Sequence, residues 1–324
     1  MKNMLRALLS LLFLPFGAQA YVYRVDKWQK SDHVVYRFFD NHHATKPTDM
    51  HGEKQREEFI QLVQSNHGMA IIEDIEYSLP STRDQLLEPG KHVYNWMLSQ
   101  SEYDELLPRY KQNKFLACLA SQCGYNGIPH QNIEFRSLIS LALSGTIDIH
   151  FNDYMSIVNA VIQQLQQDTV QEPWTTVIAS LLNKYQYYQH LCQPLLQQLS
   201  DNPNHLVNAL AQAQWPEGMS AIIPLFDRWG FTQEGLPSAA RYKTFIASTF
   251  DTTLLEARMV KAVAENLSRP VFIAAGGMHL NNIDDSLAAA GYTFIGGYGY
   301  TTLEIINGTA TAISLIQAMD HLAQ

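Results

Sequence analysis

The sequence is poor in cysteine and in basic residues, and both shortages argue against particular classes of function. Cysteine occurs three times in 324 residues, and the absence of any CxxC pair or Cys/His cluster argues against a thiolate zinc site. Lysine and arginine together number 22 against 31 acidic residues, for a formal net charge of −9. Such an acidic chain is poorly suited to bind nucleic acid or an anionic membrane surface. We therefore expect neither among its partners.

The sequence also lacks low-complexity tracts, long linkers and internal repeats. Its hydrophobic fraction of 46% and charged fraction of 16% are typical of a folded globular protein rather than a disordered one. The length is sufficient for one large domain with a substantial core. After the first twenty residues, no segment is long and apolar enough to cross a bilayer.

The first twenty residues have the pattern of a secretory signal peptide. Lys2 and Arg6 precede the apolar residues 8–16, and residues 18–20 (AQA) offer a small-x-small cleavage site before Tyr21. The alternative, an uncleaved membrane anchor, is disfavoured because the apolar run is short for a spanning helix. We therefore expect an exported protein, periplasmic or secreted, with no stable membrane insertion after the signal is removed.

Export would place the three cysteines in an oxidising compartment. Cys118 and Cys123 are close enough in sequence to bridge a short loop, which would leave Cys192 as the odd residue. The sequence leaves this pairing open, and nothing around any of the three marks it as a catalytic thiol.

The beginning of the chain alternates between element types. Residues 33–39 (HVVYRFF) are rich in β-branched and aromatic side chains and predict a strand. Residues 53–65 predict a helix, because Phe59, Leu62 and Val63 share one face. Residues 69–77 (MAIIEDIEY) predict a second buried strand. A strand, a helix and a strand at this spacing form a βαβ unit, which implies parallel pairing.

The middle of the chain, residues 92–267, is predicted to be mostly helical. Residues 154–167 and 174–199 carry apolar side chains at three- and four-residue spacing, with glutamines on their polar faces. One exception, residues 132–139 (NIEFRSLI), is strand-like. We therefore expect a large helical insertion at about residues 140–250.

The last part of the chain returns to alternation, with a helix at 251–267, a fully apolar strand at 271–275, a helix at 281–290 and a strand at 292–297. The sequence thus predicts an α/β fold whose mostly parallel central sheet is built from both ends of the chain. Residues 21–324 are expected to form a single domain.

Metal-ligating side chains follow three of the predicted strands. The first strand runs into residues 40–43 (DNHH), the second into 73–76 (EDIE) and the late strand into 276–279 (GGMH). In open α/β sheets, ligands and catalytic groups collect at the carboxyl ends of the strands. A histidine, a carboxylate and a second histidine there form the set that a catalytic divalent metal needs, with positions left open for water.

Spacing narrows the choice of ligands at the first two strand ends. Neighbours on an extended segment point to opposite faces, so His42 and His43 are not expected to reach the same ion. Glu73 lies nearest the apolar residues of its strand, where an unpaired charge is costly, so a functional partner is expected there.

At the late strand end, Gly276 and Gly277 allow close approach of the backbone, and His279 then lies near a helix N-terminus. That position also favours anions, so a carboxylate or phosphate of a substrate is expected to dock there.

These three stretches resemble the TraB/GumN/Tiki group, part of a wider set that includes erythromycin esterase-like and ChaN-like haem-binding proteins. Such proteins typically have Gly-x-x-His after an early strand, a glutamate after the next, and a second Gly-x-x-His late in the chain. Gly276 to His279 match the late motif and Glu73 matches the glutamate. His43 aligns with the early histidine, but Asp40 stands where the glycine is expected. The resemblance covers the front and back of the chain and not its helical middle.

The resemblance implies a metal-dependent hydrolase of the protease or esterase type that acts on a small-molecule or peptide substrate. His43, Glu73 and His279 would be the catalytic residues and the ligands of a divalent Mn, Co or Zn ion. The esterase branch implies instead that a histidine acts as general base. An alternative is a non-catalytic exported protein that binds haem or another small ligand on the same fold. A decayed site, with the helical middle as an interaction surface, is a third.

Residues outside these motifs have two interpretations each. Arg136 would orient a carboxylate or bind substrate, or form a salt bridge with Glu134 beneath the helical insertion. Arg258, on the helix before the late strand, has the same two interpretations. The tyrosines at 185, 187 and 188 would pack at a helix interface or, with His190, hold haem.

Overall fold

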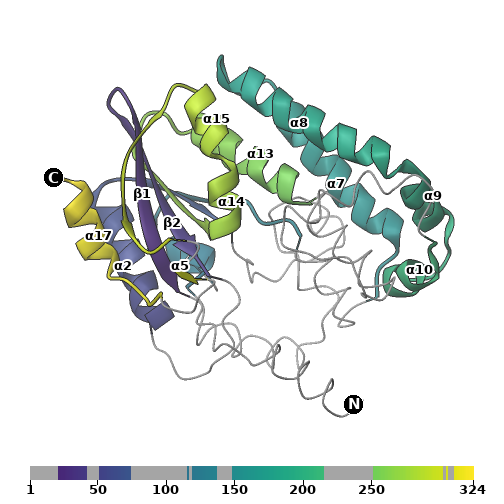
Figure 1. The fold of residues 1–324 in the computed structure, drawn as a ribbon, viewed down its shortest axis with the longest axis horizontal. Helices are drawn as coiled ribbons and strands as arrows, with labels where there is room; N and C mark the ends of the chain where they lie inside the picture. The colour runs from purple at the N-terminus through teal and green to yellow at the C-terminus, as the bar shows by residue number, and fades with distance from the viewer. Residues whose placement is uncertain are drawn as a thin grey trace, which may run out of the picture.

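A six-stranded mixed sheet forms the centre of the fold (Figure 1). The structure is a computed structural model, and the residues that it describes are 21–41, 51–73, 115–116, 119–136, 148–214, 251–301, 304–305 and 310–324. The strands, in chain order, are β1 (Val22–Lys30), β2 (His33–Asp40), β3 (Met69–Ile72), β4 (His130–Asn132), β5 (Val271–Gly276) and β6 (Thr293–Gly299). The predicted signal peptide, residues 1–20, lies outside the described residues.

The strand order in the sheet is β4-β3-β5-β2-β1-β6. The β4–β3, β3–β5 and β5–β2 pairs are parallel, whereas the β2–β1 and β1–β6 pairs are antiparallel. This confirms the α/β class and a mostly parallel sheet built from both ends of the chain. The predicted βαβ unit needs a correction, because β5 lies between β2 and β3. The two strands run in the same direction but do not pair with each other.

Helices cover both faces of the sheet (Figure 1). Their bounds are α2 (His51–Ser65), α5 (Leu119–Tyr125), α7 (Phe151–Gln166), α8 (Trp174–Leu191), α9 (Gln193–Asp201), α10 (Leu206–Gln212), α13 (Asp251–Ala264), α14 (Gly277–Asn282), α15 (Asp284–Ala289) and α17 (Leu315–Leu322). Helices α2, α5 and α17 pack on one face, and α13, α14 and α15 pack on the other.

The central strand β5 explains why both faces need this cover. Phe272 and Ala274 belong to the core under α2, α5 and α17, whereas Val271, Ile273 and Ala275 belong to the core under α13. All six residues of β5 are buried. A continuous apolar run is therefore required, and it is the pattern from which the sequence predicted this strand.

The helical middle of the chain is confirmed where it is described. Helices α7 to α10 follow β4 in the chain, and α13 packs against α8 and α7 (Figure 1). Several predicted elements differ in their bounds, among them the helix predicted at 174–199, which divides into α8 and α9. Of the strand predicted at residues 132–139, Asn132 belongs to β4 and residues 133–136 are irregular chain, whereas residues 137–139 lie outside the described residues. The helix predicted at 281–290 begins earlier, at Gly277, and divides into α14 and α15. Within the described ranges, no helix combines the length and the hydropathy that spanning a membrane requires.

Gly297 on β6 provides a test of this packing. Gly297 lies opposite Asp26 of β1, and a Cβ added to Gly297 would lie 2.5 Å from Asp26 Oδ1. We expect Gly297→Ala to lower the free energy of unfolding by about 1–3 kcal/mol, because the methyl group must displace a buried carboxylate. Urea unfolding measures this. The matched control is Gly296→Ala, whose Cβ would meet only Leu322 Cδ2 at 3.6 Å. Equal unfolding midpoints for the two variants would contradict the expectation.

Candidate functional site

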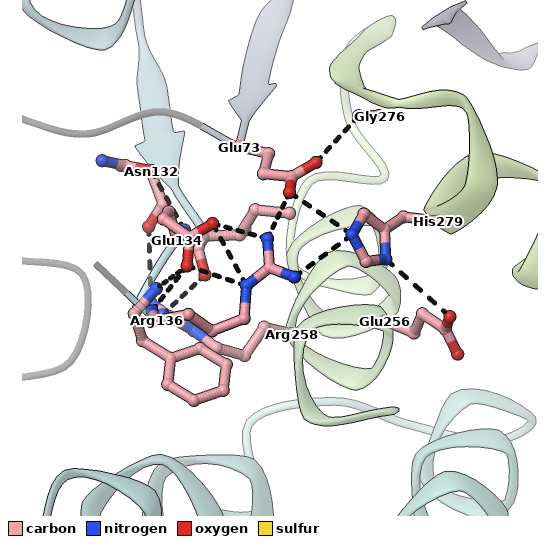
Figure 2. A network of polar contacts seen from close by, with 10 residues as sticks. Glu73, Asn132, Glu134, Arg136, Glu256, Arg258, Gly276 and His279 are labelled. Atoms are coloured by element: carbon pink, nitrogen blue, oxygen red, sulfur yellow. Dashed lines mark hydrogen bonds and ion pairs between the residues drawn. The ribbon is translucent and has the colours of Figure 1, made fainter. Parts of the chain in front are cut away.

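The carboxyl ends of β4, β3 and β5 lie side by side, because these strands are parallel neighbours in the sheet. Glu73 directly follows β3, Arg136 lies in the irregular segment after β4, and His279 lies in α14, which starts directly after β5. Figure 2 shows the side chains of these three residues turned toward one another. The structure therefore brings together two of the three predicted catalytic residues and the predicted substrate-binding arginine.

Glu73 is fixed at the centre of this cluster by the backbone of β5. The residue is only 5% exposed. The backbone N–H of Gly276 donates to Glu73 Oε2 over 2.8 Å, and the N–H of Glu73 donates to the carbonyl of Ala274 over 2.9 Å. These bonds compensate in part for burying a carboxylate, which is costly without partners. The Gly276 N–H thus binds the protein's own carboxylate, and the anion dock expected at this helix start stays a prediction.

The guanidinium group of Arg136 connects the cluster. Its Nη2 donates to Glu73 Oε1 and, over 2.6 Å, to Glu134 Oε2. Its Nε donates to Glu134 Oε1 over 3.0 Å, and its Nη1 lies 3.2 Å from His279 Nε2. The planar fork of arginine suits such multiple recognition. The expected salt bridge with Glu134 is therefore present, and it extends to the predicted catalytic glutamate.

Glu134 is held by its own segment of chain. Its carboxylate accepts the backbone N–H groups of Phe135 and Arg136 at 2.8 and 2.5 Å, and its N–H donates to Asn132 Oδ1. Burial raises the pKa of the Glu134 carboxyl, but the charge and hydrogen bonds of Arg136 outweigh this and hold the pKa below its usual value. Glu134 and Arg136 thus meet within the irregular segment that follows β4.

His279 lies between two carboxylates and is 6% exposed. Its Nε2 is 3.4 Å from Glu73 Oε1, and its Nδ1 is 4.0 Å from Glu256 Oε1. A guanidinium group has donors only, so Nε2 accepts from Arg136 and a ring proton is on Nδ1. Within the described residues, Nδ1 is buried and makes no hydrogen bond. Nδ1 therefore faces the Glu256 carboxylate (Figure 2).

Glu256, which the sequence reasoning did not select, completes the surroundings of His279. It belongs to α13 and is 1% exposed. Burial raises the pKa of its carboxyl, and nearby His279 opposes this. The amide of Asn282 donates to Glu256 Oε1 over 2.5 Å. The signal in the sequence was an acidic residue between apolar neighbours, Leu255 and Ala257, in the helix predicted at 251–267.

Arg258, on the same helix, holds the end of β4 in place. Its Nη1 donates to the carbonyl of Ile133 over 2.7 Å, and its Nη2 donates to the carbonyl of Asn132 over 3.3 Å. Burial lowers the pKa of the Arg258 guanidinium to about 10, although the charge of Glu134 acts in the opposite direction. The contacts of Arg258 therefore support a role in positioning the segment that carries Glu134 and Arg136.

The predicted early histidine, His43, lies with His42 outside the described residues, so its place in the site stays a prediction. Gly277 is described, and a Cβ added there would lie 2.0 Å from the hydroxyl of Tyr23. The close approach predicted for this glycine is thus present, between the start of α14 and β1.

A divalent metal can be tested against the geometry of the described donors. Among these residues, no group of three or more His, Cys, Asp and Glu side chains is arranged to hold an ion. The pair Glu73 Oε1 and His279 Nε2, however, is 3.4 Å apart, and two ligands of a tetrahedral ion lie about 3.4 Å apart at bond lengths of about 2.1 Å. A histidine that binds a metal usually has a carboxylate or carbonyl beside its other ring nitrogen, and Glu256 takes this place beside Nδ1 of His279. The pair therefore fits two ligands of one ion.

The remaining predicted residues lie away from this cluster. Tyr185 is fully buried in the core and Tyr188 is half-buried, whereas Tyr187 and His190 are exposed. Of the three tyrosines, only Tyr185 is therefore fully packed in the core. Cys192 is buried and has no disulfide, and burial raises the pKa of its thiol. Cys123 is buried, but Cys118 lies outside the described residues, so the short-loop disulfide stays a prediction.

Comparisons of the chain with protein-family models, with curated proteins and with solved structures find no match. A function for the chain is therefore inferred from its own residues and their geometry.

Proposed function

We propose that this protein is an exported, metal-dependent hydrolase whose site is built on Glu73 and His279, with His43 as the third ligand. The observation that carries the proposal is the contact between Glu73 Oε1 and His279 Nε2, at 3.4 Å, from the ends of two different strands. The resemblance of these stretches to the TraB/GumN/Tiki group supports the same proposal. The substrate class is an ester or peptide bond in a small molecule or a peptide.

The chemistry follows from the residues in the cluster. A bound divalent ion would lower the pKa of its water toward neutrality and so supply the nucleophile. Glu73 and His279 would hold the ion, and Glu256 would orient the ring of His279 through Nδ1. The guanidinium of Arg136 would place positive charge where negative charge develops on the substrate carbonyl oxygen.

The same residues allow a route without metal, in which His279 acts as the general base. Nε2 would take a proton from water after Arg136 has moved away from it. Glu73, beside Nε2, and Glu256, beside Nδ1, would then stabilise the charged ring. The two routes differ in one measurable property, which is their dependence on a metal ion.

Removal of metal is the experiment that tests the proposal. We expect the purified protein to hydrolyse a p-nitrophenyl ester or a labelled peptide, and chelation followed by dialysis to lower the rate at least about tenfold. Addition of Mn²⁺, Co²⁺ or Zn²⁺ should restore the rate, and mass spectrometry should find the metal in the untreated protein.

Two results would contradict this proposal in different ways. Hydrolysis that is unchanged by chelation, in protein free of metal, rejects metal dependence and favours His279 as general base. Absence of hydrolysis of both substrate types with every metal rejects the hydrolase. In that case, a Soret band on titration with haem would identify the ligand-binding alternative.

A further inference from the structure

The guanidinium group of Arg136 contacts the two atoms that would bind a metal ion. Its Nη2 binds Glu73 Oε1, and its Nη1 lies 3.2 Å from His279 Nε2. These are the same two atoms whose separation fits two ligands of one ion. One cation therefore already lies across the pair, and a second cation has to displace it.

Glu134 gives Arg136 a second anchor that is independent of this pair. It binds Nε and Nη2 of Arg136, and it is itself fixed by two backbone N–H groups. If the Nη groups left Glu73 and His279, Glu134 would still hold the side chain close by. Arg136 is also the more exposed partner: its side chain is 16% exposed, compared with 4% for Glu73. The Arg136 side chain is therefore less enclosed than the carboxylate it covers.

The charges around the cluster are shared among several fixed cations. Glu73 and Glu134 pair with Arg136, the charge of Glu134 also acts on Arg258, and the charges of Lys184 and Arg136 act on Glu256. A divalent ion at Glu73 and His279 would therefore compete with Arg136 for Glu73, while Arg136 stays paired with Glu134.

We propose that Arg136 is the resident cation of the Glu73–His279 pair, that a divalent metal ion displaces it, and that Glu134 retains it beside the site. The inference rests on the proposed function, because it takes Glu73 and His279 as metal ligands. Its consequence is that the apparent metal affinity is reduced by the fraction of molecules in which Arg136 covers the pair. Arg136 and Glu134 then act on affinity in opposite directions.

The test is the affinity of three variants and the wild type for Mn²⁺, Co²⁺ and Zn²⁺ alone, measured by competition with a chelating dye. We expect Arg136→Gln to bind metal about tenfold more tightly, because the competing cation is gone. We expect Glu134→Gln to bind about tenfold more weakly, because Arg136 then pairs with Glu73 alone. The matched control is Arg24→Gln, which removes the same charge from a part-buried arginine paired with Asp26 on β1. It should bind as the wild type does.

A purely structural role for Arg136 gives a different result, because a loosened Glu73 would weaken metal binding in both variants. Affinity in Arg136→Gln that equals or falls below that of the wild type therefore overturns the inference, and metal binding by the wild type would leave the proposed function standing. If neither the wild type nor Arg136→Gln binds metal, both this inference and the proposed metal-dependent function are overturned.

If Arg136→Gln fails to fold by circular dichroism, Arg136→Lys replaces it. A single ammonium group cannot span Oε1 and Nε2 as the planar fork does. The affinity of Arg136→Lys should then exceed that of the wild type, and an equal or lower affinity overturns the inference.

Discussion

Replacement of His279 by alanine is expected to lower kcat/KM for ester or peptide hydrolysis by about 10³-fold and to abolish metal binding. The imidazole is the only group of this residue that reaches Glu73, and its Nε2 is the predicted ligand or base. The expected loss is large because both proposed routes pass through this nitrogen. Steady-state kinetics and metal analysis of the purified variant measure the two effects.

The matched control for this variant is His130→Ala. His130 is a half-buried histidine on β4 whose Nδ1 bonds the carbonyl of Ile128 over 3.0 Å. Its removal should leave activity and metal content unchanged. If His279→Ala folds with the thermal midpoint of the wild type and retains full activity, the proposed site is wrong.

Replacement of Asp26 by alanine is expected to lower the free energy of unfolding by about 3–5 kcal/mol, because it leaves a buried arginine partly uncompensated. Arg37 on β2 is 1% exposed, and its Nη2 donates to Asp26 Oδ2 over 2.9 Å. The guanidinium carbon also lies 5.0 Å from the ring centre of Trp28. Urea unfolding at pH 7, with circular dichroism as the signal, measures the loss.

The same arginine connects the sheet to the helices beside the site. Its Nη1 donates to the carbonyl of Leu280 in α14 and to Asp284 in α15. We therefore expect Asp26→Ala to loosen the segment that carries His279. Asp285→Ala, the exposed neighbour of Asp284, is the control and should change stability by no more than about 0.5 kcal/mol. Equal losses of unfolding free energy in Asp26→Ala and Asp285→Ala would show that the buried Asp26–Arg37 pair contributes no more to stability than an exposed aspartate does.

The meeting of Glu73 and His279 could be predicted from the sequence because it depends on a general rule. The apolar run of β5 and the buried run of β3 each identify a strand, and parallel strands place their carboxyl ends at one edge of the sheet. The residues directly after those strands then have to lie close together. The place of His43 follows from the same rule and stays a prediction.

Other features depend on contacts that periodicity does not encode. Strand β1 carries Arg24 and Asp26 at positions that are buried or half-buried only because they pair with each other and with Arg37. Arg136 reaches Glu73 from the irregular segment that follows β4, and periodicity does not specify the course of such a segment. Glu256 comes from a separate helix, and its role depends on how α13 packs against α14.

The position of β5 in the sheet has a consequence for the order in which the protein folds. Strands β2 and β3 are made early on the ribosome, but each pairs with β5, which is made much later. Until residues 271–276 emerge, these two N-terminal strands each have an open edge where β5 will lie, and open edges are prone to wrong pairing. Contacts so distant along the chain also slow folding, because the long loop must close before they form. A nascent chain that stops before β5 therefore cannot complete the sheet.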